Sequence, residues 1–332
     1  MKTSISQIAL GFVLLASPAC AGRVSAMPAR AGSSETSFDR NLAVSGQIRV
    51  EIYSGSGDVR VTSGANGAVH VHGTVHSSWS IFGSDDTRVR QIAANPPIEQ
   101  RGDTIRIGKG TSGISNLSIS YVIEVPHDTE VLLSAASGSV SISGVRGPLK
   151  VESSSGSVHV EKIDRDTTIA SSSGSVSASD LSGYLRASTS SGSITVSNVK
   201  EDVRVESSSG SIEVHDPHAR IEAQSRSGSV QIYGVTTDAK AHSQSGNLTL
   251  SGDPGKSGYW KLESSSGSVD VGVRPNSAFF FSAESSSGAI HTDIPIVIEE
   301  QGKHSLRAHV GNGGGRVEVR SASGSINVRS AS

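Results

Sequence analysis

The chain has 332 residues, of which 37 are glycine and only 4% are aromatic, and its formal net charge at pH 7 is −2. A near-neutral chain without a lysine and arginine cluster lacks the electrostatic attraction that nucleic acids and anionic lipids exploit, so we expect neither as a partner. The low aromatic content suits a thin core of valine, isoleucine, leucine and alanine better than a thick globular core.

Residues 1–21 have the features of an export signal peptide. Lys2 precedes the apolar run Ile8–Ala16, and small residues follow around Ala19-Cys20-Ala21. Cleavage after Ala21 would remove the single cysteine of the chain. The alternative is a lipoprotein whose first residue is a lipidated Cys20, although Ser17 stands where such signals usually have leucine.

After either cleavage the mature chain would contain no disulfide and no apolar run long enough to span a membrane. Residues 22–37 are rich in small and polar side chains, which indicates a disordered tether. We therefore expect an exported protein, located in the periplasm, at the cell surface or in the medium.

Residues 38–125 are predicted to form an irregular N-terminal β region. Apolar and polar residues alternate between Leu42 and Val71, with Ser-Gly and Asn-Gly turns between the alternating runs. One short helix is predicted over Ser84–Ile92, because acidic residues lie near its start and Asn95-Pro96-Pro97 stops it. We expect this region to cap a repeat array whose open end would expose unpaired strand edges.

A phrase of six residues, Ser-Ser-Ser-Gly-Ser-Val, organises the second half of the chain and stands complete at Ser153–Val158 and Ser171–Val176. Its glycine recurs at spacings of 18, then twice at 21 and once at 36, at Gly138, Gly156, Gly174, Gly192, Gly210, Gly228, Gly246, Gly267, Gly288 and Gly324. A fixed period of this size is typical of a stacked repeat architecture.

Each repeat contains two short strands, as Gly147–Asp164 illustrates. Leu149 and Val151 alternate with polar residues before the turn, and Val158 and Val160 do so after it. Outward positions carry polar residues, among them Lys150, Arg186, Arg204, Glu206, Thr195, Glu213 and Gln231. The pattern predicts an apolar core between the two strands of each repeat.

Two architectures fit this unit: a β-solenoid, in which equivalent residues stack about 4.8 Å apart, and an antiparallel meander. A flat meander would leave its apolar face uncovered, whereas a coil closes on its own core. We predict an all-β fold, a single-chain β-solenoid of 18-residue coils over residues 126–332. The corner glycines are expected at positive φ, and the corner serines are expected to form a ladder along one edge.

The stretch Ile119–Lys150 resembles the bacterial DUF4097 β-strand-repeat proteins, in which a strand ending in Val-Pro leads into recurring Ser-Gly turns. The resemblance covers roughly residues 38–332. It implies an exported solenoid-like protein of a family labelled as adhesins, and it implies no catalytic residues.

The period becomes irregular towards the C-terminus. Residues 251–258 lie in a longer spacing, which indicates a loop at one edge of the array. Between Gly288 and Gly324 we expect one coil without its glycine, with residues 311–315 as a flexible turn.

Histidines form two groups that could suggest a metal site. His70, His72 and His76 alternate along one expected strand, and His215 and His218 flank a turn. No cysteine or nearby carboxylate completes the first group, and Pro217 indicates that the second group is a turn. We therefore predict outward polar positions and no metal.

Two pairs of carboxylates could indicate a catalytic site, because some β-helical enzymes cut polysaccharides with paired acids. Glu206 and Glu213 should point outward from opposite faces of one coil, and Glu263 and Glu284 should lie side by side on successive coils. No nucleophile elbow accompanies them. We therefore predict no catalytic, cofactor-binding or metal-binding residue.

The sequence thus predicts an exported, non-catalytic adhesin-like or scaffold protein of the bacterial envelope, whose partner is a polysaccharide or a protein. The alternatives are a carbohydrate-active β-helix enzyme and a purely structural spacer.

Overall fold

The structure is a computed structural model that describes residues 34–331 except 66, 78–85 and 112–115. All described residues belong to one compact unit, Ser33–Ser332. The expected signal peptide, 1–21, and most of the expected tether lie outside the described residues. Residues 34–37, which we had assigned to the tether, instead form the beginning of a strand.

The described residues form two sheets of 14 and 15 strands, here sheet A and sheet B, and one helix, α1 (Asp86–Ala94). In spatial order sheet A contains β1 (Ser34–Ala43), β4 (Ala68–Ser77), β7 (Leu117–Pro126), β3 (Val59–Gly64), β9 (Val140–Ser143), β11 (Val158–Ile163), β13 (Val176–Leu181), β15 (Ile194–Val199), β17 (Ile212–Pro217), β19 (Val230–Val235), β21 (Leu248–Gly252), β23 (Val269–Val273), β29 (Ile326–Ser330) and β25 (Ile290–Thr292). Sheet B contains β26 (Val297–Gln301), β27 (Ser305–Val310), β24 (Phe279–Ser285), β28 (Gly315–Ser321), β22 (Tyr259–Ser264), β20 (Ala239–Ser243), β18 (Ile221–Ser225), β16 (Val203–Ser207), β14 (Leu185–Thr189), β12 (Thr167–Ser171), β10 (Leu149–Ser153), β8 (Glu130–Ala135), β2 (Arg49–Ser54), β6 (Thr104–Ile107) and β5 (Ile98–Arg101).

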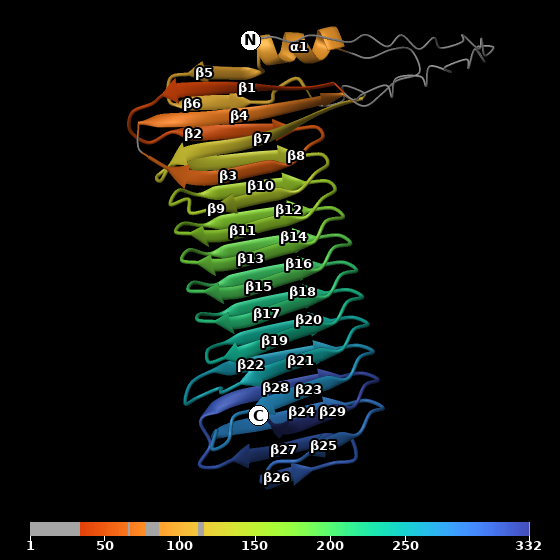
Figure 1. The fold of residues 1–332 in the computed structure, drawn as a ribbon. Coiled ribbons are helices and arrows are strands. Elements are labelled where there is room, and N and C mark those ends of the chain that lie inside the picture. The colour runs from red at the N-terminus through yellow and green to blue at the C-terminus, as the bar shows by residue number, and fades with distance from the viewer. Residues whose placement is uncertain (1–33, 66, 78–85, 112–115, 332) are drawn as a thin grey trace, which may run out of the picture. The chain divides into compact units, whose positions relative to one another are not determined.

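Each coil of the array contributes one strand to each sheet, and successive coils pair in parallel (Figure 1). Leu149 pairs with Thr167 on the next coil, and Val158 pairs with Val176, so equivalent residues are 18 apart. The predicted solenoid is confirmed, and the meander is excluded because its strands would pair antiparallel.

The core lies between the two sheets and consists of the side chains that the alternation predicted. In the coil of β10 and β11, Leu149, Val151, Val158, Val160 and Ile163 are all at most 2% exposed. Burial of each such aliphatic side chain stabilises the fold by about 1.5–3 kcal/mol.

A left-handed residue near the end of six successive sheet A strands, β9 to β19, keeps the last apolar residue inside. The residues six positions after the corner glycine have positive φ at Gly144, Lys162, Asp180, Asn198, Asp216 and Gly234. They are skipped in the pairing, as between Glu161–Ser179 and Ile163–Leu181. This irregularity reverses the alternation, so Ile163 faces inward three positions after Val160. Aspartate, asparagine and glycine occupy such positions more easily than other residues.

The corner glycines are required by close stacking of the backbone, and the expectation of positive φ was wrong for most of them. Gly138 and Gly156 have φ of 107° and 124°, but Gly174 and the later corner glycines are not in the left-handed region. A Cβ at Gly210 would overlap the carbonyl group of Gly192 on the preceding coil. Only a residue without a side chain allows this approach.

The expected serine ladder is present, and its buried member links neighbouring coils. The fully buried Ser243 accepts a hydrogen bond from the amide of Gly246 (2.8 Å) and donates one to the carbonyl of Gly228 on the previous coil (3.3 Å). The bond from the glycine amide recurs at Ser171, Thr189, Ser207, Ser225, Ser264, Ser285 and Ser321. These side chains therefore have a structural role.

The coils do not stack in chain order at either end. The last coil, β28–β29, lies between the coils β22–β23 and β24–β25. At the other end β2–β3 lies between β6–β7 and β8–β9. The regular array expected over 126–332 therefore extends only to β23. Beyond it, the expected coil without a glycine is the strand pair β26–β27, which pairs antiparallel.

Antiparallel strands cover the N-terminal end of the array. β4 pairs antiparallel with β1 and β7, and β5 pairs antiparallel with β6. Helix α1 packs on β1 and β4 through the buried Val89, and its Ala94 carbonyl accepts a hydrogen bond from Arg40 (3.1 Å). The expected helix began at Ser84, which lies outside the described residues together with Asp85.

Candidate functional site

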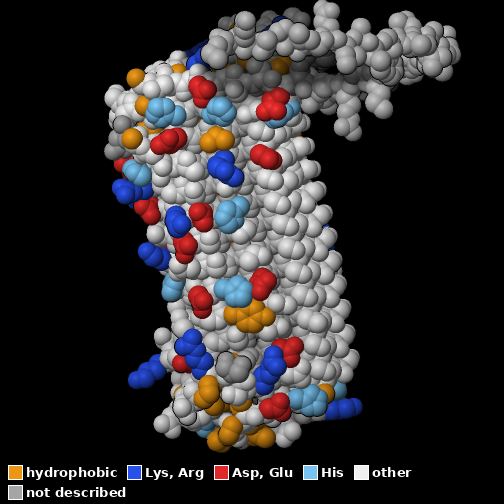
Figure 2. Space-filling model, viewed as in Figure 1, with side chains coloured by type: hydrophobic (Ala, Val, Ile, Leu, Met, Phe, Trp, Pro, Cys, Tyr) orange, Lys and Arg blue, Asp and Glu red, His pale blue; other side chains and the backbone are white. Residues whose placement is uncertain are grey.

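A groove of about 740 Å³ follows the corner at which sheet B leads into the serine-glycine turns. It extends across seven coils, from Ser134 to Gln244. The lining consists of the last outward position of seven sheet B strands and of the residues that follow it, which are mostly serines. The adjoining turns form the pale band along the right-hand edge of Figure 2, where charged and hydrophobic side chains are scarce.

The groove continues towards the C-terminal end of the array. His242 lines the groove and also a further hollow of about 380 Å³, which includes Glu263, Glu284, His304 and Arg320. Because equivalent residues of neighbouring coils are about 4.8 Å apart, this surface presents the same polar positions at regular intervals.

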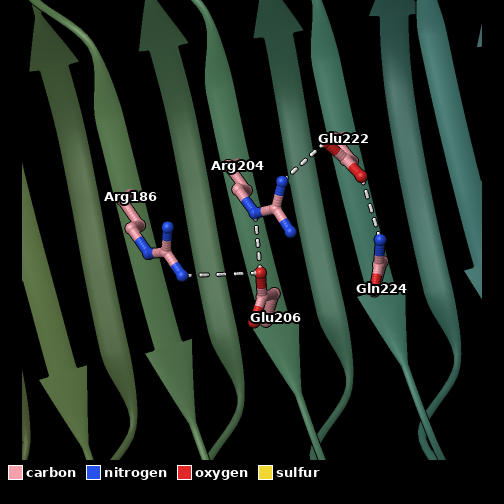
Figure 3. Close-up of polar contacts among 5 residues, drawn as sticks. All are labelled: Arg186, Arg204, Glu206, Glu222 and Gln224. Atoms are coloured by element: carbon pink, nitrogen blue, oxygen red, sulfur yellow. Dashed lines mark hydrogen bonds and ion pairs between the residues drawn. The ribbon is translucent and has the colours of Figure 1, made fainter.

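A network of opposite charges crosses the outer face of sheet B beside the groove (Figure 3). Glu206 lies 2.7 Å from Arg204 and 3.9 Å from Arg186, measured between carboxylate oxygen and guanidinium nitrogen. Arg204 also contacts Glu222 at 3.0 Å, and Gln224 donates to Glu222 at 2.9 Å. The hydrogen bond to Glu206 and the charge of Glu222 raise the pKa of Arg204. The carboxylates of Glu206 and Glu222 balance the positive charges of Arg186 and Arg204, which are neighbours on successive coils.

Glu152 of the groove and Glu263 of the further hollow are paired in the same way. Glu152 lies 2.8 Å from Lys150, and Glu263 lies 2.8 Å from Lys261. The hydrogen bond to Glu263 raises the pKa of Lys261. A lining of paired charges and hydroxyl groups can bind a polar ligand that offers both donors and acceptors.

The first histidine group lies on β4, where His72 and His76 meet carboxylates of β1 and His70 pairs with Asn41. His72 Nδ1 lies 2.7 Å from Asp39 and His76 Nδ1 lies 3.7 Å from Glu35, in agreement with the pairing of these residues across the two strands. The sequence analysis missed these carboxylates because they are more than 30 residues away in the chain.

The second histidine group also has polar partners. His215 contacts Glu213 at 2.8 Å and stacks on Tyr233 with ring centroids 5.1 Å apart, whereas His218 contacts Asn198 at 3.0 Å. Among the residues that the structure describes, no group of three or more histidine, cysteine, aspartate or glutamate side chains could hold a metal ion.

One of the two carboxylate pairs is arranged as expected and the other is not. Glu206 belongs to sheet B and Glu213 to sheet A, so they occupy opposite faces of one coil. Glu263 and Glu284 were expected side by side, but Arg320 of the inserted strand β28 pairs with both positions. Arg320 contacts Glu284 at 3.4 Å, so the like charges are separated by a cation.

Arg186, Arg204 and Glu206 lie at the outward positions predicted from the sequence, but the network between them was not predicted. The sequence contains a signal for this network. Outward positions at intervals of 18 residues place Arg186, Arg204 and Glu222 in one row.

A family model for the Toastrack DUF4097 proteins matches residues 43–233 and 188–329. The chain belongs to the Toastrack DUF4097 family. The resemblance inferred from Ile119–Lys150 is therefore confirmed, and this Toastrack chain has no helix in its described part that is long and apolar enough to cross a membrane. No curated protein matches the sequence.

Three solved structures are similar to this Toastrack chain. They are a "putative cell adhesion protein" from Clostridium sporogenes (10% identity over 89% of this chain and 100% of that chain, TM-score 0.22), a "putative adhesin" from Bacteroides fragilis (13%, 89% and 98%, TM-score 0.38) and a "putative lipid binding protein" from Parabacteroides distasonis (17%, 88% and 96%, TM-score 0.39). These similarities identify no ligand.

Proposed function

We propose that this Toastrack protein is an exported, non-catalytic binding protein of the bacterial envelope, and that an extended polysaccharide lies along the sheet B groove. The observation that carries the proposal is the continuity of the groove across seven coils. An extended polymer can use such a site because both the ligand and the protein repeat along one axis.

The lining favours a polar ligand without a large net charge. Its carboxylates Glu152 and Glu206 have lysine or arginine partners within 2.8 Å. Ser154, Ser172 and Ser190 add hydroxyl groups that donate and accept hydrogen bonds. The hydroxyl groups of a sugar chain have the same dual character.

The pairing of the acids also supports a binding role over catalysis. Glycoside hydrolysis generally uses two carboxyl groups that flank one bond, one of them protonated. The groove instead presents single carboxylates on separate coils, each beside a cation. The sequence of residues 1–21 supports export.

The test is an array of polysaccharides and cell-wall fragments, scored for binding and for release of shorter products. We expect binding without turnover. Ser190→Tyr should block the groove, whereas Ser191→Tyr is the matched control, because Ser191 is also exposed at the same corner but does not line the groove. Product release would favour the enzyme, and equal binding by both variants would place the ligand elsewhere.

A further inference from the structure

A second hollow, of about 370 Å³, lies near the C-terminal end of the outer face of sheet B. Strands β24, β26, β27 and β28 contribute its walls. Besides the largely buried Phe281, Ala308 and Val319, its lining consists of Phe280, Ser282, Glu284, Glu299, Arg307, Arg316, Glu318 and Arg320. It shares Glu284 and Arg320 with the further hollow that continues the groove.

The small side chain of Ser282 creates this hollow. Ser282 pairs with Glu318 on β28 and with Arg307 on β27. The outward positions before and after it on β24 are Phe280 and Glu284, because side chains alternate along a strand. Serine is therefore surrounded on four sides by longer side chains and forms the floor.

Phe280 gives the hollow an apolar wall in an otherwise charged surrounding. Its side chain is 44% exposed, although its neighbours Phe279 and Phe281 are buried in the core. The ring meets His309 edge-on, with centroids 6.3 Å apart. Such a ring can pack against the C–H face of a ligand while the polar walls bind its other groups.

The guanidinium groups of the hollow are only partly engaged. Arg316 lies 3.8 Å from Glu318, and its side chain is 66% exposed. Arg307 contacts Glu300, which does not line the hollow, and is 61% exposed. Both can turn towards an anion, and a planar guanidinium group binds a carboxylate through two parallel hydrogen bonds.

The hollow is lined by three arginines and three glutamates. Because their charges balance, a ligand that offers only a negative charge would bind weakly. A suitable ligand needs an anionic group for the arginines, hydroxyl donors for the glutamates and an apolar face for the ring. We propose that the hollow binds an acidic sugar residue. Its carboxylate pairs with Arg307 and Arg316, its hydroxyl groups donate to Glu284 and Glu318, and its C–H face packs on Phe280.

This inference goes beyond the proposed function, because it concerns other residues and a single sugar unit. The two proposals can therefore fail separately. Ser190→Tyr in the groove should leave uronate binding at the hollow unchanged.

The test is calorimetric titration of the mature protein with galacturonate, glucuronate and mannuronate oligosaccharides, each compared with its methyl ester. We expect at least one acid form to bind, and its ester to bind at least tenfold more weakly. Ser282→Leu should abolish binding by filling the hollow, and Arg307→Gln should weaken it at least tenfold.

Ser197→Leu is the matched control, because Ser197 is also an outward, half-buried serine but lies on sheet A. Circular dichroism should show that all variants are folded. The proposal is overturned if no uronate binds, if acid and ester bind equally, or if Ser282→Leu binds as the wild type does.

Discussion

Replacement of Gly210 by alanine tests the reason for the glycine repeat. The added Cβ would lie 2.9 Å from the amide nitrogen of Ser193 and closer still to the carbonyl group of Gly192. These atoms belong to the backbone of the preceding coil, so no side chain can move aside. Because φ of Gly210 is outside the left-handed region, the cost comes from this overlap and not from strain in φ.

The expected loss of stability combines two effects. Overpacking of a close-packed site costs about 1–3 kcal/mol. A shift of the corner would also weaken the 2.9 Å hydrogen bond from the Gly210 amide to Ser207, which contributes about 0.5–1.5 kcal/mol. Together they predict that the free energy of unfolding falls by about 1.5–4.5 kcal/mol.

The measurement is urea unfolding followed by far-ultraviolet circular dichroism, with two control variants. Ser209→Ala changes an exposed residue of the same corner and should stay within about 0.5 kcal/mol of the wild type. Gly102→Ala changes a residue with φ of 56° and open space around it, so it measures the cost of φ alone. If Gly210→Ala is no more destabilising than Gly102→Ala, the stacking explanation is wrong.

Three further predictions concern the ladder, a buried phenol and the repeat length. Ser243→Ala should lower the free energy of unfolding by about 1–3 kcal/mol, because the Gly246 amide loses its buried acceptor. Ser245 is exposed, so Ser245→Ala should change the free energy of unfolding little in the same assay. Equal effects of the two substitutions would contradict a structural role of the serine ladder. Burial raises the pKa of Tyr121 to about 12. The neutral phenol should therefore contribute its full stability below about pH 10, and this contribution should fall as the pH rises towards 12. Tyr121→Phe should remove this alkaline loss of stability in thermal melts, and an unchanged loss would exclude Tyr121 as its cause. Deletion of residues 183–200 should leave a folded protein that is one coil shorter, whereas deletion of residues 183–191 should unfold it. Small-angle scattering measures the length and circular dichroism the folding. The same outcome for both deletions would refute the 18-residue coil.

The sequence predicts the regular part of the fold because each coil repeats the same local chemistry. The alternation of Leu149 and Val151, and of Val158 and Val160, determines which side chains are inside. The glycine spacing determines which coils are neighbours wherever the coils stack in chain order. The left-handed residue at Asp180 or Asn198 could also have been predicted, because aspartate or asparagine recurs there.

The out-of-order stacking at the ends could not be predicted in the same way. A coil that is inserted, such as β28–β29, and a coil that is appended have the same inward and outward pattern. Nothing in that pattern specifies which neighbour a strand pairs with. For this reason Glu263 and Glu284 were expected to be adjacent, and the position of Arg320 between them was missed.

The candidate site depends on side chains whose outward position was predicted but whose partners were not. The contact of Arg204 with Glu222 joins neighbouring coils, and the hollow at Ser282 exists only because β28 and β27 both pair with β24. Such sites arise from stacking, so they become visible only when the order of the coils is known.

The most direct test of the proposed function is hydrogen exchange of the protein with and without the polysaccharide that binds best on the array. The size of the recovered polysaccharide is measured in the same samples. We predict slower exchange in peptides that contain the groove corners between Ser134 and Gln244, and a polysaccharide of unchanged length. Protection confined to other surfaces, or a shortened polysaccharide, would contradict a non-catalytic protein that binds its ligand along the groove.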